Sequence, residues 1–170
     1  MKRIAITLLT ALLLAPSTTL GQTRRRSTPQ RTTPAQTQAR VSQVRTAGAT
    51  KVADQIKHLT RFIYVLGSVT SGITAADEAA RRNEGNPAVV QESRAKVKSS
   101  IAGFREGLDR LEIEFRTTPE LQPYYIKLAG VAAGAATAEQ EAAANRFDAS
   151  GRSLLNVVGR LADVLVVMRQ

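Results

Sequence analysis

From Val52 onward, apolar residues recur at alternating steps of four and three, which keep them in line along one side of an α-helix. This first row predicts a helix over residues 46–82. The stretch "NEGNP" at residues 83–87 ends that helix and supplies a cap and a first-turn proline for the next one. The members of the row are Val52, Ile56, Leu59, Ile63, Leu66, Thr70 and Ile73.

Further along the chain, the pattern predicts three more helices. The row with the clearest helical period predicts a helix over residues 88–116, with acid–base pairs four residues apart on its solvent side. Thr118 before Pro119 repeats the cap-and-proline signature and predicts a helix over 119–145. Its small-residue stretch "LAGVAAGAATA" favours close approach of a neighbouring helix. A last helix is predicted over 151–169. Its apolar row is Leu154, Val158, Leu161, Leu165 and Met168.

Four amphipathic segments joined by short loops predict an all-α fold. The loops leave no room for long crossover connections, so we expect an antiparallel up-down-up-down four-helix bundle over residues 44–170, with packing of the coiled-coil kind. No alternating strand pattern competes with this prediction.

The start of the chain has the layout of a secretory signal peptide. Lys2 and Arg3 precede an uncharged apolar stretch at residues 4–15, and a Pro/Ser/Thr region then ends in small residues at Gly21. The apolar stretch has 12 residues, whereas a transmembrane helix needs about 20. We therefore expect residues 1–21 to be removed and the protein to act outside the cytoplasm, either in a periplasm or after secretion.

The basic charge of the chain is concentrated in a short segment. Residues 22–50 contain six arginines and no acidic residue, whereas residues 51–170 contain 16 cations and 14 anions. The net charge of +10 therefore describes a tail more than a folded surface. Residues 22–43 are rich in Thr, Arg, Pro and Gln and poor in apolar side chains, so we expect this segment to be disordered. The alternative is an early start of the first helix, because Thr33 before Pro34 has the pattern of a cap followed by a first-turn proline.

Two roles fit the basic tail. One is weak adhesion to an anionic membrane surface or to lipopolysaccharide, with about 1 kcal/mol from each cation. The other is a solvated linker that binds nothing. Nucleic acid is disfavoured as the polyanion, because residues 22–50 offer no aromatic side chain to stack on a base. The candidate polyanion-binding residues are Arg24, Arg25, Arg26 and Arg31.

Catalytic and cofactor motifs are absent from the sequence. The chain has no cysteine, and His58 is its only histidine, so thiolate chemistry, a catalytic zinc of the usual kind and a ferritin-type di-iron centre are excluded. A haem held by His58 and Met168 is disfavoured, because the predicted bundle separates the two residues by roughly 12 to 20 Å along its axis. We predict no cofactor, no metal and no enzymatic activity.

The last predicted helix is apolar beyond its row. Val166 and Val167 fall outside the face that the row predicts, and clustered exposed apolar residues mark interfaces. The alternative is that a neighbouring helix covers them. We expect a structural or protein-interaction role, with an unknown protein partner or a homo-oligomer. The alternative function is a small apolar ligand or cofactor held in the bundle interior, with Tyr124 and Tyr125 near one end.

Overall fold

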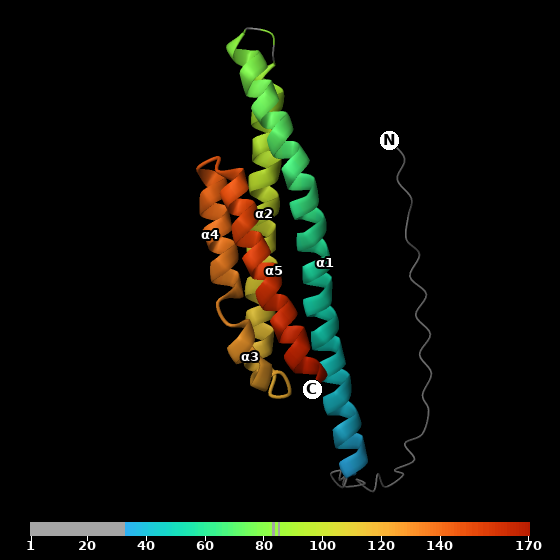
Figure 1. Cartoon of the computed structure of the whole chain (residues 1–170). Helices are drawn as coiled ribbons and strands as arrows, with labels where there is room; N and C mark the ends of the chain where they lie inside the picture. Colours follow the sequence, from blue (N-terminus) through green and yellow to red (C-terminus); the bar gives the residue numbers. More distant parts are fainter. Residues whose placement is uncertain (1–32, 83, 85) are drawn as a thin grey trace, which may run out of the picture. The chain divides into compact units, whose positions relative to one another are not determined.

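The computed structural model describes residues 33–82, 84 and 86–170, and every regular element in these residues is an α-helix (Figure 1). The prediction of an all-α fold is therefore confirmed. The predicted signal peptide and residues 22–32 of the basic tail lie outside the described residues. The helices are α1 (Pro34–Arg81), α2 (Pro87–Thr117), α3 (Gln122–Leu128), α4 (Val131–Ala143) and α5 (Phe147–Arg169).

Helix α1 begins before its apolar row does. The row predicts a start near residue 46, whereas the helix starts at Pro34. Proline suits the first helical turn because its missing N–H would have no partner there. The backbone N–H of Thr33 donates to Gln36 Oε1 at 3.2 Å, which ties the side chain of the first turn back to the cap. The prediction of disorder is therefore wrong for residues 34–43, because local capping starts a helix without an apolar row.

The single helix predicted over 119–145 is wrong, because the structure divides this segment into α3 and α4. Gly130 separates them with φ 84°, a left-handed conformation that glycine adopts without steric cost. Arg160 on α5 donates to the carbonyl oxygens of Ala129 and Gly130, at 3.0 Å for Gly130. These bonds satisfy carbonyl groups that the interrupted helix leaves without partners.

Helix α5 begins at Phe147 rather than at the predicted residue 151. The turn before it is tight: Asn145 has φ 59°, and the Arg146 N–H donates to the Glu141 carbonyl at 2.8 Å. Phe147 and Ser150 are both buried, so the core-facing side of α5 extends beyond the predicted row toward the start of the helix. Packing of these two residues places the helix start earlier than the break residues suggested.

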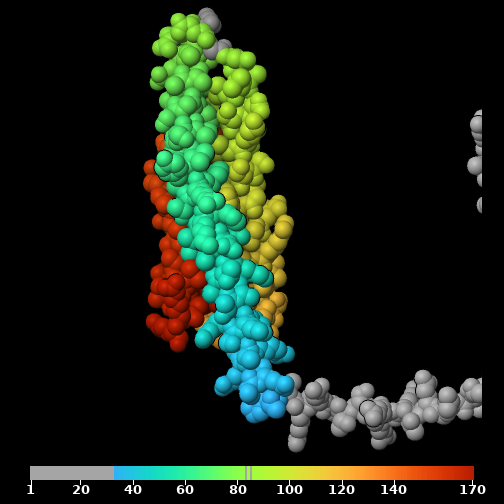
Figure 2. Space-filling view, turned by 90° about the vertical axis from the view of Figure 1, so that its right-hand side faces the viewer, coloured from blue at the N-terminus to red at the C-terminus, as the bar shows by residue number. Residues whose placement is uncertain are grey.

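Helix α1 packs on α2 and α5, and both α2 and α5 pack in addition on α3 and α4. Figure 2 shows α1 flanked by α5 on one side and by α2 on the other, with the connected ends of α1 and α2 extending past the turn before α5. The buried residues of α1 repeat every seven positions, as in coiled coils. The repeating residues are Val52, Leu59, Leu66 and Ile73, and Gly48 is buried one turn before them.

The interior between these helices is filled by aliphatic side chains and two aromatic rings. Phe115 of α2 is fully buried, Phe147 closes the end near the α4–α5 turn, and Tyr124 and Tyr125 pack half-buried against the core from α3. Gly134 of α4 admits a close neighbour, because its Cβ position lies only 2.9 Å from Val157 Cγ2. The small-residue stretch thus packs tightly against α5, as predicted for its α4 half.

Candidate interaction face

Large apolar side chains remain exposed on the adjoining flanks of α1 and α5. Leu155 and Val166 of α5 are 54% and 58% exposed, and Tyr64 of α1 is 85% exposed. Exposed apolar residues that gather on one surface, rather than lying singly, indicate a binding surface. The α1 and α5 flanks are therefore the candidate functional site.

Helical spacing places the α5 residues on one flank. Gly151 lies against α1, since its Cβ position is 3.6 Å from Leu66 Cδ2. Leu155, Ala162 and Val166 follow Gly151 at steps of four, seven and four, which keep them on the α1 side of the helix. Ala162 is exposed like its two larger neighbours. The result is an uncharged strip along α5 beside α1.

The matching strip of α1 borders two shallow hollows. One is a groove of about 300 Å³ between α1 and α5, lined by residues that include Ile63, Gly67, Gly151 and Leu155. The other is an open hollow of about 720 Å³ along α1, lined by Ile56, Lys57, Thr60, Arg61, Tyr64 and Val65. We call the combined surface the α1–α5 face. It consists of Ile56, Thr60, Ile63, Tyr64 and Gly67 of α1 and Leu155, Gly159, Ala162 and Val166 of α5.

Two glycines of this face have no packing role within the chain. Among the described residues, no neighbouring atom lies within 4 Å of the Cβ positions of Gly67 and Gly159, yet a glycine inside a helix costs about 0.5–1 kcal/mol relative to alanine. Gly134, by contrast, is needed for close packing on Val157. Gly72 and Gly103 are equally open, so an open glycine alone does not define the face. Its significance here comes from the exposed apolar residues around it.

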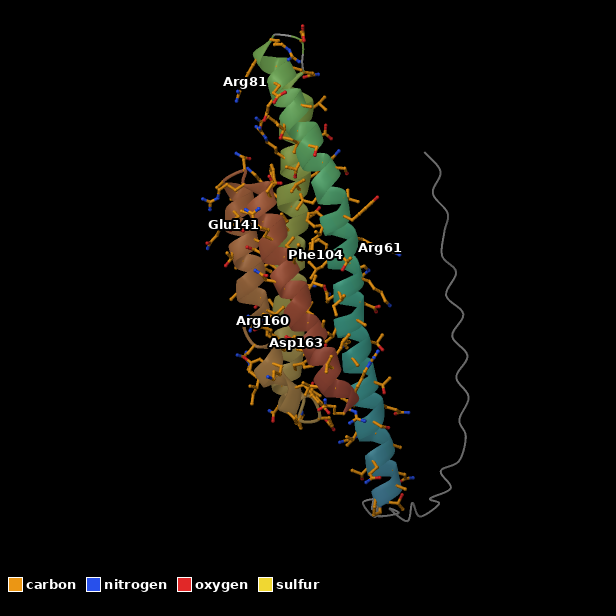
Figure 3. All side chains as sticks on the ribbon, in the orientation of Figure 1. Arg61, Arg81, Phe104, Glu141, Arg160 and Asp163 are labelled. Carbon is orange, nitrogen blue, oxygen red and sulfur yellow. The ribbon has the colours of Figure 1, made fainter. Side chains whose placement is uncertain are left out.

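Charged residues flank the face and also line its two hollows: Lys57 and Arg61 line the open hollow along α1, and Asp148 and Arg152 line the groove between α1 and α5. Figure 3 labels Arg61 on α1 and Asp163 on α5. Neither forms an ion pair with another described residue, whereas Lys57 pairs with Asp54 of its own helix at 3.1 Å. The α1 rim is therefore basic, and the α5 rim carries an available carboxylate.

The polar contacts between helices lie elsewhere. Lys51 pairs with Glu114 between α1 and α2, Arg105 pairs with Glu139 between α2 and α4, and Ser153 donates to Glu141 between α5 and α4. Among the described residues, no side-chain hydrogen bond or ion pair joins α1 to α5. The contact between α1 and α5 is therefore held by packing and not by side-chain hydrogen bonds or ion pairs between described residues.

The two valines predicted as an interface lie on different flanks of α5. Val166 belongs to the α1–α5 face, whereas Val167 is half-buried. Val167 is seven residues beyond Arg160, which bonds to Ala129 and Gly130, so Val167 lies on the flank nearer α3 and α4. The structure thus separates the pair and places Leu155, which the sequence argument missed, on the same flank of α5 as Val166, about three turns earlier. Leu155 lies outside the predicted row, as Val166 does, so the row held a signal for its exposure that the sequence argument did not use.

The structure does not bring His58 and Met168 together. His58 is exposed and lines a hollow of about 390 Å³ between α1 and α2, beside Phe62 and Phe104. Met168 is buried on α5, with its Cε 3.4 Å from the Cβ position of Gly48. Gly48 and His58 are ten residues apart on α1, about 15 Å along the helix axis.

A polar cleft of about 370 Å³ lies where the α4–α5 turn meets α1 and α2. Arg94 pairs with Asp77 across it, and Arg146, Asp148 and Arg152 complete its charged lining. The two carboxylates offset much of the charge of the three arginines. The cleft therefore resembles a polar junction between helices more than a strongly charged ligand site.

The candidate polyanion residues Arg24, Arg25, Arg26 and Arg31 all lie outside the described residues. Arg40, the next arginine of the run, belongs to α1 and pairs with Glu120 at 3.1 Å. That contact holds the early part of α1 near the α2–α3 connection.

Two further properties of the described residues bear on function: the ability of a helix to cross a membrane and the ability of side chains to hold a metal ion. None of their helices combines the length and the hydropathy that crossing a membrane requires. Nor do these residues contain three His, Asp or Glu side chains grouped so that they could hold a metal ion. Comparison of the chain with protein-family models, with curated proteins and with solved structures finds no match.

Proposed function

We propose that this chain is an exported helical bundle without enzymatic activity, and that it works by binding another protein through the α1–α5 face. The observation that carries the proposal is the exposure of Tyr64, Leu155 and Val166 on adjoining flanks of two helices that share no polar contact. A protein surface of this kind gains free energy when a partner removes it from water.

The proposed architecture is an antiparallel up-down-up-down four-helix bundle, in which α3 and α4 together take the place of the third helix. The contacts of each long helix with two others support this arrangement. The proposed location is outside the cytoplasm, after removal of residues 1–21. The signal-peptide layout of Lys2, Arg3 and the apolar residues 4–15 supports it.

The tail supplies a second, weaker interaction in this proposal. Its arginines adhere loosely to an anionic membrane surface or to lipopolysaccharide and keep the bundle near the envelope. Replacing Arg24, Arg25, Arg26 and Arg31 by glutamine should abolish pelleting with anionic vesicles at low salt. Equal pelleting of the two proteins would leave the tail as a linker only.

The test of the proposed function is chemical cross-linking in the producing cells, using the full chain with a C-terminal tag. We expect the exported protein to begin near Gln22 and to form a cross-linked complex. Leu155→Glu and Val166→Lys should remove that complex, because each places a charge on the apolar face. The matched control is Ile126→Glu, since Ile126 is 80% exposed on α3 and lies outside the face.

Two results would contradict the proposal. Retention of the chain in the cytoplasm with residues 1–21 intact would remove the export part. A complex that survives both face substitutions as well as it survives Ile126→Glu would show that the face is not the binding surface.

A further inference from the structure

We propose that the α1–α5 face binds a second copy of this chain, in a dimer whose two-fold axis runs parallel to α1 and α5. Each α1 then packs antiparallel on the α5 of the partner copy. This inference rests on the proposed function of the face and names its occupant. The register of the two helices, the sizes of the facing side chains and the placement of the charges support it.

Two contacts within the chain define the register of α1 against α5. The Cβ position of Gly151 lies 3.6 Å from Leu66 Cδ2, and that of Gly48 lies 3.4 Å from Met168 Cε. Residue 66 is therefore level with 151 along the helix axes, and 48 is level with 168. Each step forward along α1 matches one step back along α5. A two-fold axis parallel to the helices does not change the position of any residue along the helix axis. Residue 66 of one copy is therefore also level with residue 151 of the partner copy.

In this register the open glycine and the neighbouring alanine of α5 face the middle of the partner's α1. Gly159 and Ala162 are level with residues 55–58, so their small side lets the two backbones approach closely there. Tyr64 of one copy lies within two or three residues of the level of the partner's Leu155 and covers that side chain. Close approach to a partner would explain a helix-interior Gly159 that packing within the chain does not require.

The charges at the rims favour the same arrangement. Lys57 and the partner's Asp163 differ in level by three residues, about 4.5 Å, a distance that a lysine side chain spans. The present pair of Lys57 with Asp54 is exposed, at 68% and 49%, and is weak enough to be exchanged. A dimer that stacked α1 on α1 would instead bring the Lys57 and Arg61 side chains of both copies together.

The size of the face predicts a weak dimer. The shared levels from residue 48 to residue 66 span about 27 Å, and two helices side by side are about 20 Å wide. The buried area is then about 550 Å² per copy and about 1,100 Å² in total, near the lower limit for a specific interface. Arg152 also lies near the partner's Arg61, which weakens the association further. We therefore expect a concentration-dependent equilibrium and not a permanent dimer.

The first experiment is sedimentation equilibrium of the chain from Gln22 onward, between about 1 µM and about 1 mM, the range in which weak interfaces dissociate. The weight-average mass should rise from that of a monomer toward that of a dimer. Leu155→Glu and Val166→Lys should weaken dimerisation by about tenfold or more, because each buries a charge. Ile126→Glu should leave it unchanged, and circular dichroism should show equal helix content in all variants.

The second experiment tests whether α1 packs on the α5 of the partner copy. The chain contains no cysteine, so any disulfide must come from the introduced residues. Ala53→Cys and Ala162→Cys are made as separate proteins. By the register, Ala53 of one copy lies within two residues of the level of Ala162 of the other. Under oxidation, a mixture of the two proteins should form a disulfide-linked dimer, whereas each protein alone should form little.

The outcomes separate this inference from the proposed function. A monomeric mass over the whole concentration range would overturn the inference. Cross-linking of either cysteine protein alone, equal to that of the mixture, would overturn the α1-on-α5 arrangement. If the purified chain is monomeric while complexes in cells still require Leu155 and Val166, the proposed function stands and the partner is a different protein.

Discussion

Helix α5 contacts α1 on one flank and α4 on the other, and the two contacts differ in kind. On the α4 flank, Ser153 donates to Glu141 at 2.8 Å and the Cβ position of Gly134 lies 2.9 Å from Val157. The α1 flank has no such polar bond, and its outer edge holds Leu155 and an open Gly159. Polar bonds and close packing thus complete the α4 contact within the chain. The α1 contact ends in apolar surface that another molecule can cover.

The largest expected effect is a difference in the free energy of unfolding between variants at two adjacent residues, Leu154 in the core and Leu155 at the outer edge. Leu154→Ala should lower the free energy of unfolding by about 2–5 kcal/mol, because it leaves a cavity in the core. Leu155→Ala should change it by less than about 0.5 kcal/mol in dilute solution, because its side chain is half exposed. Urea unfolding of both variants provides the comparison. A large loss for Leu155→Ala would mean that this residue holds the fold together and is not available for binding.

Two glycines, Gly134 at the contact between α4 and α5 and Gly159 on the α1 flank of α5, give the next largest expected effects. Gly134→Ala should destabilise the protein by about 1–3 kcal/mol, because the new methyl group would meet Val157. Gly159→Ala should stabilise the monomer by about 0.5–1 kcal/mol, because its surroundings are open and alanine favours helix. Thermal unfolding at low protein concentration measures both. Destabilisation by Gly159→Ala would show that the chain itself packs closely there.

The smallest expected effect concerns the polar bond of the α4 flank. Ser153→Ala should cost about 0.5–1.5 kcal/mol, since it removes the donor to Glu141. Asn156→Ala changes an exposed position of the same helix and should alter stability by less than about 0.5 kcal/mol. Equal effects in chemical unfolding would mean that the Ser153 bond contributes nothing to holding α4 on α5.

The sequence rows indicated part of the core-facing side of the long helices correctly; on α5, the row members Val158 and Leu165 are half-buried, whereas Val157 and Val164 are fully buried. Val52, Leu59 and Leu66 of α1 are buried, as are Leu154 and Leu161 of α5. These positions could be read in advance because burial of one helix side imposes a period on the local chain. The row does not place the helix start at Pro34; the local signal for that start is the cap-and-proline pattern of Thr33 and Pro34, which acts without any apolar row.

The break at Gly130 shows a different limit of the sequence. A run of alanine and glycine is compatible with one long helix, and the pattern contains no proline to end it. In the structure, Arg160 from a distant helix binds the carbonyl groups at the break. A bond that joins residues 30 positions apart leaves no local signal in the sequence.

The sequence alone determined that the protein is helical and where its core-facing rows lie, because the helical period is a property of neighbouring residues. Only the tertiary structure decided that Val166 and Leu155 share an exposed face while Val167 turns toward α3 and α4. The reason is that the exposure of a residue outside the core row depends on which helices lie beside it. Those neighbours come from distant parts of the chain, and their placement is a result of packing.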